Sequence, residues 1–274
     1  MNKLVVIFFC LFFVQCQSQT KKPEKPETSA EKKIRQDAII QEHVYDCADK
    51  IGYTMMMKEY QDCLDAGLKK DSTIAYLWQQ KAMPYYKVRK YSVGKVYLDK
   101  AVEYDEKRWL PYRGFMKCIF SKDYKGAIED FDKCITKYGN SYEMDHTYAF
   151  YIGLSYLMIN EFEKATNVFK KDIEAQIADR NEAHFIDWFY YGISFYEQQK
   201  WEEALNCFNQ TLEVYHDLAE AQYFKAVCLA RLGRSESEIN LFFDSAIANG
   251  KKGNTINEDN AVYEKYPYQL SWKN

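Results

Sequence analysis

Glycine and proline are scarce in this sequence, at 11 and 5 of 274 residues. Their scarcity disfavours collagen-like, proline-rich and many-turned all-β architectures. Positive charge is not in excess either, because 37 Lys and Arg residues stand against 40 Asp and Glu residues. The net charge of −3 gives no electrostatic reason to expect a nucleic acid as a partner. With 47% apolar and 28% charged residues, the chain is expected to fold, and it is neither disordered nor a polytopic membrane protein.

The sequence also lacks the short motifs of common enzymes and metal sites. It contains no Cys-x-x-Cys, no His-Glu-x-x-His and no glycine-rich phosphate-binding loop. The four histidines are far apart in the sequence, at His43, His146, His184 and His216. We therefore expect no catalytic residue, no metal site and no cofactor. His184 and Asp187 are three residues apart on a predicted helix, a spacing more typical of a surface pair than of a functional site.

The first sixteen residues have the layout of an export signal. Lys3 precedes an unbroken apolar run of eleven residues, Leu4–Val14. At 1.5 Å per residue in a helix, this run is too short to cross a hydrocarbon core of ~30 Å. A basic start followed by a short apolar run is typical of a secretory signal peptide, which we predict over residues 1–16. A small N-terminal membrane anchor is the alternative.

The end of this segment leaves two processing outcomes open. Phe13–Cys16 resembles a bacterial lipobox, in which Cys16 is lipidated and becomes the first mature residue, although Gln15 stands where a small residue is usual. The alternative is ordinary signal-peptide cleavage after Ser18. Both outcomes predict an exported protein, either periplasmic or anchored to the outer membrane of a bacterium. The polar stretch 17–33 predicts a flexible linker.

From residue 34 to residue 250 the apolar residues recur with the helical period, and one pattern repeats along the chain. Gly153 and Gly192 are each followed by an aromatic residue three and nine positions later, by Ala after twelve and by Phe after sixteen. Further copies surround Ala82, Gly114 and Ala226, and a degenerate one precedes them. Two of the intervals between these small residues are 39 positions long. We expect the extra residues to lengthen helices or loops around 138–145 and 171–182.

This order of residues resembles the tetratricopeptide repeat, a helix–turn–helix unit of about 34 residues. Trp188 matches the aromatic residue at the start of its first helix, and Gly192 and Ala204 match the small residues at which the two helices approach. Trp201 and Phe208 match the large residues that fill the gap to the neighbouring unit. The resemblance implies an all-α fold, a right-handed α-solenoid of about six hairpins over residues 34–250.

The resemblance also implies a concave groove lined by the first helix of each hairpin. The groove positions fall on Tyr76, Gln79, Met83, Tyr86, Phe150, Leu154, Phe189, Ile193, Tyr196, Tyr223 and Arg231. This set is aromatic and apolar, and it lacks the Lys, Asn and Arg cluster with which some family members hold a terminal carboxylate. Tyrosine offers a large contact area at a small entropy cost. We therefore predict a non-catalytic scaffold or adaptor that binds a protein or peptide partner in this groove.

Two alternatives to that prediction remain open. Many of these aromatic side chains could instead be core between repeats, because a solenoid needs bulky packing between its units. The protein could also bind another ligand, such as a glycan, or assist an enzyme in the cell envelope.

The C-terminal tail, residues 251–274, breaks the helical pattern. Tyr266, Tyr268, Leu270 and Trp272 alternate with a period of two, as in an extended segment. We expect the tail to fold back onto the last hairpin or into the groove. A flexible tail that recruits a partner is the alternative.

The cysteines suggest two disulfides. Cys47 and Cys63 are 16 residues apart, and so are Cys118 and Cys134. In a helical hairpin this spacing brings a residue of one helix opposite a residue of the other. Outside the cytoplasm both pairs are therefore candidates for a disulfide. The alternative is that cysteine fills small buried positions of the repeat.

Overall fold

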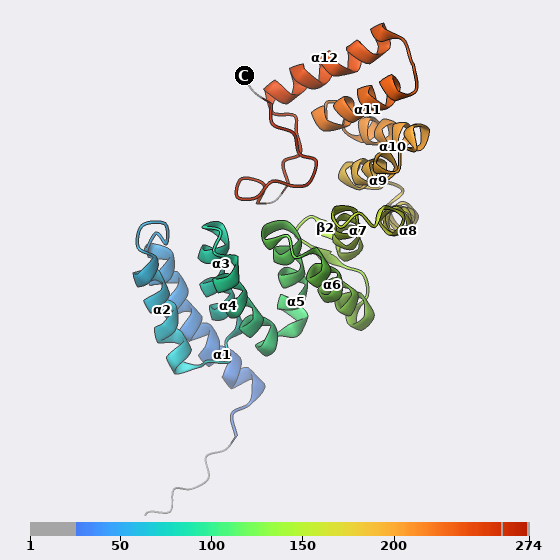
Figure 1. The fold of residues 1–274 in the computed structure, drawn as a ribbon. Helices are drawn as coiled ribbons and strands as arrows, with labels where there is room; N and C mark the ends of the chain where they lie inside the picture. Colours follow the sequence, from blue (N-terminus) through green and yellow to red (C-terminus); the bar gives the residue numbers. More distant parts are fainter. Residues whose placement is uncertain (1–25, 259, 273–274) are drawn as a thin grey trace, which may run out of the picture.

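The computed structural model describes residues 26–258 and 260–272. In these ranges twelve α-helices pack as successive antiparallel pairs, and the pairs follow one another along an arc (Figure 1). The expected all-α solenoid is confirmed. The predicted signal peptide with Cys16, and the first part of the predicted linker, lie outside the described residues. No helix in the described part is long and apolar enough to cross a membrane.

The helices form six hairpins. These are α1 (Ser29–Ile40) with α2 (Met57–Lys70), α3 (Ala75–Lys87) with α4 (Tyr91–Tyr104), α5 (Glu106–Phe115) with α6 (Tyr124–Tyr138), α7 (Tyr148–Met158) with α8 (Phe162–Arg180), α9 (Phe185–Glu197) with α10 (Trp201–Val214), and α11 (Ala219–Arg231) with α12 (Glu236–Lys252). Three short helical turns, η1 (Gln41–Tyr45), η2 (Ala48–Lys50) and η3 (Met116–Ser121), follow α1 and α5. One hairpin alone cannot bury both of its faces, so the stacking of hairpins creates the core.

The first helix begins earlier than the sequence predicts. α1 starts at Ser29, inside the stretch predicted as a flexible linker. The Thr28 hydroxyl accepts a hydrogen bond from the Glu31 backbone N–H, and the Glu31 carboxylate accepts one from the Thr28 backbone N–H at 2.8 Å. This capping box satisfies two backbone donors that the first turn of a helix leaves unpaired. The linker prediction is therefore wrong for residues 29–33.

Glycine allows the two helices of a hairpin to approach closely. A Cβ atom added to Gly153 would lie 2.9 Å from the Phe169 ring, and one added to Gly192 would lie 2.8 Å from the Phe208 ring. Real side chains do not sit this close, so each large ring packs directly on the backbone of the facing helix. The small and large residues of the repeat therefore meet as the pattern predicts.

The two long intervals of the repeat have different structures. Between α6 and α7 the extra residues form a small antiparallel hairpin of β1 (Tyr142–Glu143) and β2 (His146–Thr147). In the next unit they lengthen α8, which at 19 residues is the longest helix of the described part. Both insertions fall where the sequence analysis expects them. The β-hairpin brings His146 to the inner side of the array.

The interior is divided into two clusters. The larger runs from α3 to α11 and includes Ile256 and Tyr266 of the tail. The smaller is formed mainly by the first hairpin and includes Leu77 of α3, and Tyr76 and Trp78 of α3 pack against both clusters. The first hairpin therefore has its own core and is joined to the rest through α3.

Candidate functional site

The C-terminal tail lies on the inner side of the arc, where it faces helices from both halves of the molecule (Figure 1). After α12 the chain leaves the last hairpin, passes β2 and turns near residues 260–264. It then returns toward α9 and α11. The expectation that the tail folds back agrees with this course, and the surface that it covers is the candidate functional site.

The turn of the tail is held by the loop between α3 and α4. The Glu264 carboxylate accepts a hydrogen bond from the Tyr91 hydroxyl, and it lies 3.1 Å from the Arg89 guanidinium. Arg89 also donates to the carbonyl oxygen of Tyr263 at 3.2 Å. A residue of the tail is thereby fixed to a hairpin more than 170 positions earlier in the chain.

The middle of the tail is held mainly through its backbone. The Tyr190 hydroxyl of α9 donates to the carbonyl oxygen of Pro267 at 2.7 Å. Lys122, between η3 and α6, donates to the carbonyl oxygen of Lys265 at 3.1 Å. Such bonds recognise a peptide backbone whatever its side chains.

The end of the tail is fixed by α9 and α11. The buried Glu220 carboxylate accepts the backbone N–H groups of Ile256 and Leu270, at 3.2 and 3.1 Å. The Tyr268 hydroxyl donates to Glu197 at 2.7 Å, and the Tyr268 ring packs edge-on against Phe224 with centroids 5.9 Å apart. One carboxylate therefore joins two points of the tail, and an aromatic side chain fills the space beside it.

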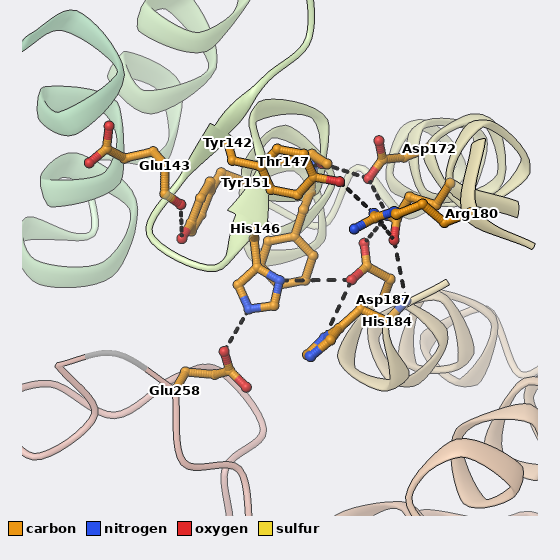
Figure 2. A network of polar contacts seen from close by, with 12 residues as sticks. Tyr142, Glu143, His146, Thr147, Tyr151, Asp172, Arg180, His184, Asp187 and Glu258 are labelled. Carbon is orange, nitrogen blue, oxygen red and sulfur yellow. Dashed lines mark hydrogen bonds and ion pairs between the residues drawn. The ribbon is translucent and has the colours of Figure 1, made fainter. Parts of the chain in front are cut away.

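A buried polar network lies where the tail passes β2 (Figure 2). The Nε2 atom of His146 is 2.6 Å from the Glu258 carboxylate of the tail. On the other side of the ring, Nδ1 of His146 is 3.8 Å from Oδ2 of Asp187, and Nδ1 of His184 is 3.8 Å from the same oxygen. The ring of His146 also stacks on Phe150, with centroids 3.9 Å apart. Segments distant in the sequence thus meet at one imidazole.

The carboxylates of this network have further partners. Gln176 of α8 donates to Oδ1 of Asp187 at 2.9 Å and to Oδ2 of Asp172 at 3.1 Å. Thr147 donates to the same Asp172 oxygen at 2.6 Å. Burial raises the pKa of Asp172, and the Thr147 hydrogen bond only partly offsets this effect.

The two histidines of the network have opposite pKa shifts. Burial alone would lower the pKa of His146, because it disfavours the charged imidazolium, but Asp187 and Glu258 outweigh it and raise the pKa to about 9. Partial burial and the neighbouring His146 charge lower the pKa of His184. Asp187 is almost fully buried, at 2% exposure, so the prediction of a surface pair with His184 is wrong.

More than half of the predicted groove residues are interior. Tyr86, Phe150, Leu154, Phe189 and Ile193 are each at most 2% exposed, and Gln79 is 6% exposed. They fill the spaces between helices; the Phe189 ring, for example, packs against those of Phe208 and Phe224. For these six residues the core alternative is correct.

The remaining predicted groove residues keep partly exposed side chains. These are Tyr76, Met83, Tyr196, Tyr223 and Arg231. Tyr223 packs edge-on against Trp272 of the tail, with centroids 6.4 Å apart. Arg231 lies over the ring of Trp201, 5.7 Å from its centroid. Tyr223 therefore lies at the surface that the tail covers.

Sequence reasoning missed the residues that hold the tail. Tyr190 and Glu220 belong to the predicted helices, but nothing in the repeat distinguishes them from their neighbours. His146 and Glu258 are 112 positions apart, so no local pattern could pair them. These residues contact the tail only because the array curves and brings distant segments of the chain together.

The two candidate disulfides differ in the structure. Cys47 and Cys63 are joined, with Cα atoms 5.9 Å apart. Cys118 and Cys134 are buried free thiols. Cys118 lies in the π-helical turn η3, and its Sγ is 3.4 Å from the Ser155 hydroxyl of α7. It thus faces the next hairpin instead of α6, and the second predicted disulfide is wrong.

Comparison with known proteins supports the fold. A tetratricopeptide repeat profile matches residues 192–254, and no curated protein sequence matches the chain.

The type IV pilus biogenesis factor PilW aligns with a TM-score of 0.60 at 13% identity, covering 79% of this chain and 94% of PilW. The C-terminal part of a TPR repeat-containing protein from Cytophaga hutchinsonii aligns with 0.56 at 14% identity, covering 80% of each chain. MamA from Desulfovibrio magneticus RS-1 aligns with 0.55 at 13% identity, covering 65% of this chain and 96% of that one. The architecture is that of tetratricopeptide-repeat solenoids.

Proposed function

We propose that this chain is a non-catalytic scaffold that binds an extended segment of a protein partner on the inner side of its arc. The observation that carries the proposal is the position of its own tail. Residues 254–258 and 260–272 occupy that surface as an irregular, largely non-helical segment. A surface that accommodates one such segment has the shape and hydrogen-bonding groups for another.

The contacts to the tail indicate what a partner would need. Tyr190, Lys122 and Glu220 bind backbone groups, so they would accept many sequences. Arg89 and Tyr91 bind a carboxylate, and Phe224 with Glu197 receives a tyrosine. The partner segment is therefore expected to be extended, with an acidic residue and an aromatic residue spaced as Glu264 and Tyr268 are.

We also propose that the protein works in the bacterial cell envelope, tethered through Cys16. Two features support this location. The apolar run Leu4–Val14 has the length of a signal peptide. The Cys47–Cys63 disulfide suits an oxidising compartment outside the cytoplasm.

Photo-crosslinking in cells tests the binding surface. A photoreactive residue replaces Tyr196, which is partly exposed on α9 near the tail, and a matched control replaces Val214, which is 53% exposed on α10. We expect a discrete protein adduct from position 196 and none from position 214. The same adducts from both positions, or none from either, would contradict the proposal.

Replacement of Cys16 by Ser tests the anchor. Without its thiol, residue 16 cannot carry a lipid, so the protein is expected to move from the membrane fraction to the soluble fraction. Replacement of Cys10, inside the apolar run, is the control and should leave fractionation unchanged. Membrane association that persists in the Cys16→Ser variant would exclude lipidation at this residue as the anchor.

A further inference from the structure

The buried network beside the tail contains the donor set of a metal centre. His146 begins β2 of the β-hairpin, His184 immediately precedes α9, and Asp187 lies in the first turn of α9. One ligand atom from each of the three residues lies within 4.8 Å of the others. Figure 2 shows their side chains converging from two segments of the chain. Two imidazoles and one carboxylate are a ligand set that zinc uses in proteins.

One atom of this cluster is left without a partner. The His146 side chain is only 1% exposed, and its Nδ1 atom makes no hydrogen bond. The 3.8 Å distance to Asp187 is too long for one. A buried polar atom without a partner costs free energy and needs an explanation. Nδ1 of His146 points toward Oδ2 of Asp187, and Nδ1 of His184 approaches the same oxygen. A cation would lie in the space between these three atoms.

The surroundings of the cluster have the arrangement found around metal ligands. A histidine that binds a metal usually donates its other ring nitrogen to a carboxylate, which orients the ring and fixes the position of its proton. Here Nε2 of His146 contacts Glu258 at 2.6 Å. Oδ1 of Asp187 is likewise held by Gln176, which leaves Oδ2 free to bind. Two of the three ligands, His146 and Asp187, are therefore oriented by a neighbouring side chain.

We propose that His146, His184 and Asp187 bind a Zn²⁺ ion through Nδ1, Nδ1 and Oδ2. In a tetrahedral site with bonds of about 2 Å, ligand atoms lie about 3.3 Å apart. The two separations of 3.8 Å to Asp187 would have to shorten by about half an ångström, and the two histidine nitrogens, which lie within 4.8 Å of each other, would also have to move closer. The His184 side chain, which is 41% exposed, has room to make this movement and leaves an entry path for the ion. Three protein ligands leave the fourth position to water or to a side chain of a partner.

The site would also tie the tail to the array, because Glu258 belongs to the tail. Binding of the ion would orient His146, and Glu258 would support that orientation from the outside. The metal site does not depend on the proposed scaffold function, since its ligands come from the β-hairpin and α9. Failure of either proposal would leave the other standing.

Calorimetric titration of the full-length protein with Zn²⁺, without a polyhistidine tag, tests the site. We expect one ion per chain, and Co²⁺ in its place should give the visible absorption of tetrahedral cobalt. His184→Ala should weaken binding at least tenfold without unfolding the chain, because this exposed side chain makes no capping hydrogen bond. Glu258→Gln should weaken it by ~10-fold or more through its outer contact. His216→Ala is the control, since His216 is 89% exposed and pairs only with Asp217.

Three results would overturn the proposal. These are absence of Zn²⁺ binding by the wild-type protein, an affinity unchanged in the His184→Ala variant, and an equal loss in the His216→Ala control. The first result would mean that a proton, not a metal ion, balances the carboxylates around His146. Circular dichroism of each variant shows whether it is folded. If His184→Ala does not fold, the same Zn²⁺ titration is carried out on Asp187→Asn, which should also bind the ion more weakly than the wild type. An unchanged affinity in that variant would overturn the proposal.

Discussion

At the scale of single residues, a few polar groups determine how the segments meet. Glu220 is fully buried, and each of its carboxylate oxygens accepts a backbone N–H of the tail. Burial raises its pKa, and the hydrogen bonds from the tail only partly offset this effect. A buried charge of this kind is tolerated where hydrogen bonds replace its lost water. The docked tail and the ionised form of Glu220 therefore favour each other.

Glu220→Gln is expected to loosen the tail. An amide keeps one acceptor oxygen, and its NH₂ group would face a backbone N–H that also needs an acceptor. The free energy of local opening should fall by about 1–3 kcal/mol, the cost of leaving a buried donor unpaired. Hydrogen exchange of residues 256–270 measures this change. Glu213→Gln, on an exposed part of α10, is the control and should leave hydrogen exchange of the tail unaltered. If the control accelerated exchange of the tail as much as Glu220→Gln does, the role given to Glu220 would be contradicted.

Asp71 offers a test of pH dependence in the first hairpin. Burial opposes ionisation of its carboxyl, but hydrogen bonds from Thr73, Gln36 and Arg35 outweigh burial and lower the pKa below the ordinary 3.8. A lowered pKa in the folded state means that this group stabilises the fold above pH 3.8 and loses its contribution as pH falls. Asp71→Asn should therefore lower the free energy of unfolding by about 1–2 kcal/mol at neutral pH.

The difference between the wild type and Asp71→Asn should shrink as the pH falls below 3.8. Urea unfolding at a series of pH values measures it. A difference that stays constant into strong acid would show that the charge of Asp71 contributes nothing. Asp62→Asn, at an exposed i,i+4 pair on α2, is the control and should change stability by no more than about 0.5 kcal/mol.

At the scale of elements, the sequence was sufficient for helices and hairpins but not for their contacts with the tail. The spacing of Gly192, Ala204 and Phe208 predicts a close helix pair because these contacts lie within one repeat. The contact of Tyr190 with Pro267 spans 77 residues and depends on the curvature of the whole array. On α9 the groove prediction named Phe189 and Ile193, whose side chains are buried, and missed Tyr190. Phe189 points into the core, and Tyr190, rotated by about 100° around the helix, reaches the tail.

The two cysteine pairs show the same limit of local spacing. Equal separations of 16 residues predict equal pairing, but the π-helical turn η3 contains Cys118 and places its thiol against α7. Such a turn inserts an extra residue into the helical register. No feature of the spacing distinguished the pair that bridges from the pair that does not.

The disulfide is expected to stabilise mainly the first hairpin. Its loop of 16 residues should contribute about 3 kcal/mol through the entropy of the unfolded chain. Because this hairpin has its own core, the Cys47→Ser/Cys63→Ser double variant should lose protection in α1 and α2 while α5 to α12 stay folded. Hydrogen exchange resolves the two regions. Uniform loss of protection along the chain would contradict a separate first unit.

Thiol counting provides a direct check of the same bond. Six cysteines follow residue 33, and the structure pairs two of them. A chain that lacks the predicted signal segment is denatured without a reductant, and its free thiols are titrated. We expect four free thiols before reduction and six after it. Six thiols before reduction would exclude the Cys47–Cys63 bond.

At the scale of the whole molecule, the arc and its tail form one assembly. Contacts to the tail come from Arg89 before α4, from Tyr190 in α9 and from Glu220 in α11. The tail thus links both halves of the arc across its inner side (Figure 1). Any partner that binds there must displace the tail, so the apparent affinity for a partner is reduced by the fraction of molecules in which the tail is docked.

The most direct test of this account is binding of the tail as a separate peptide. A fluorescent peptide of residues 255–272 is titrated, by anisotropy, with the full-length chain and with a chain that ends at Asn254, whose carbonyl still accepts from Ala219. Circular dichroism first establishes that the shortened chain is folded. We predict saturable binding to the shortened chain, weakened by Glu220→Gln, and at least tenfold weaker binding to the full chain. Absence of binding to a folded shortened chain, or equal affinity for both chains, would contradict a peptide-binding inner surface that the tail occupies.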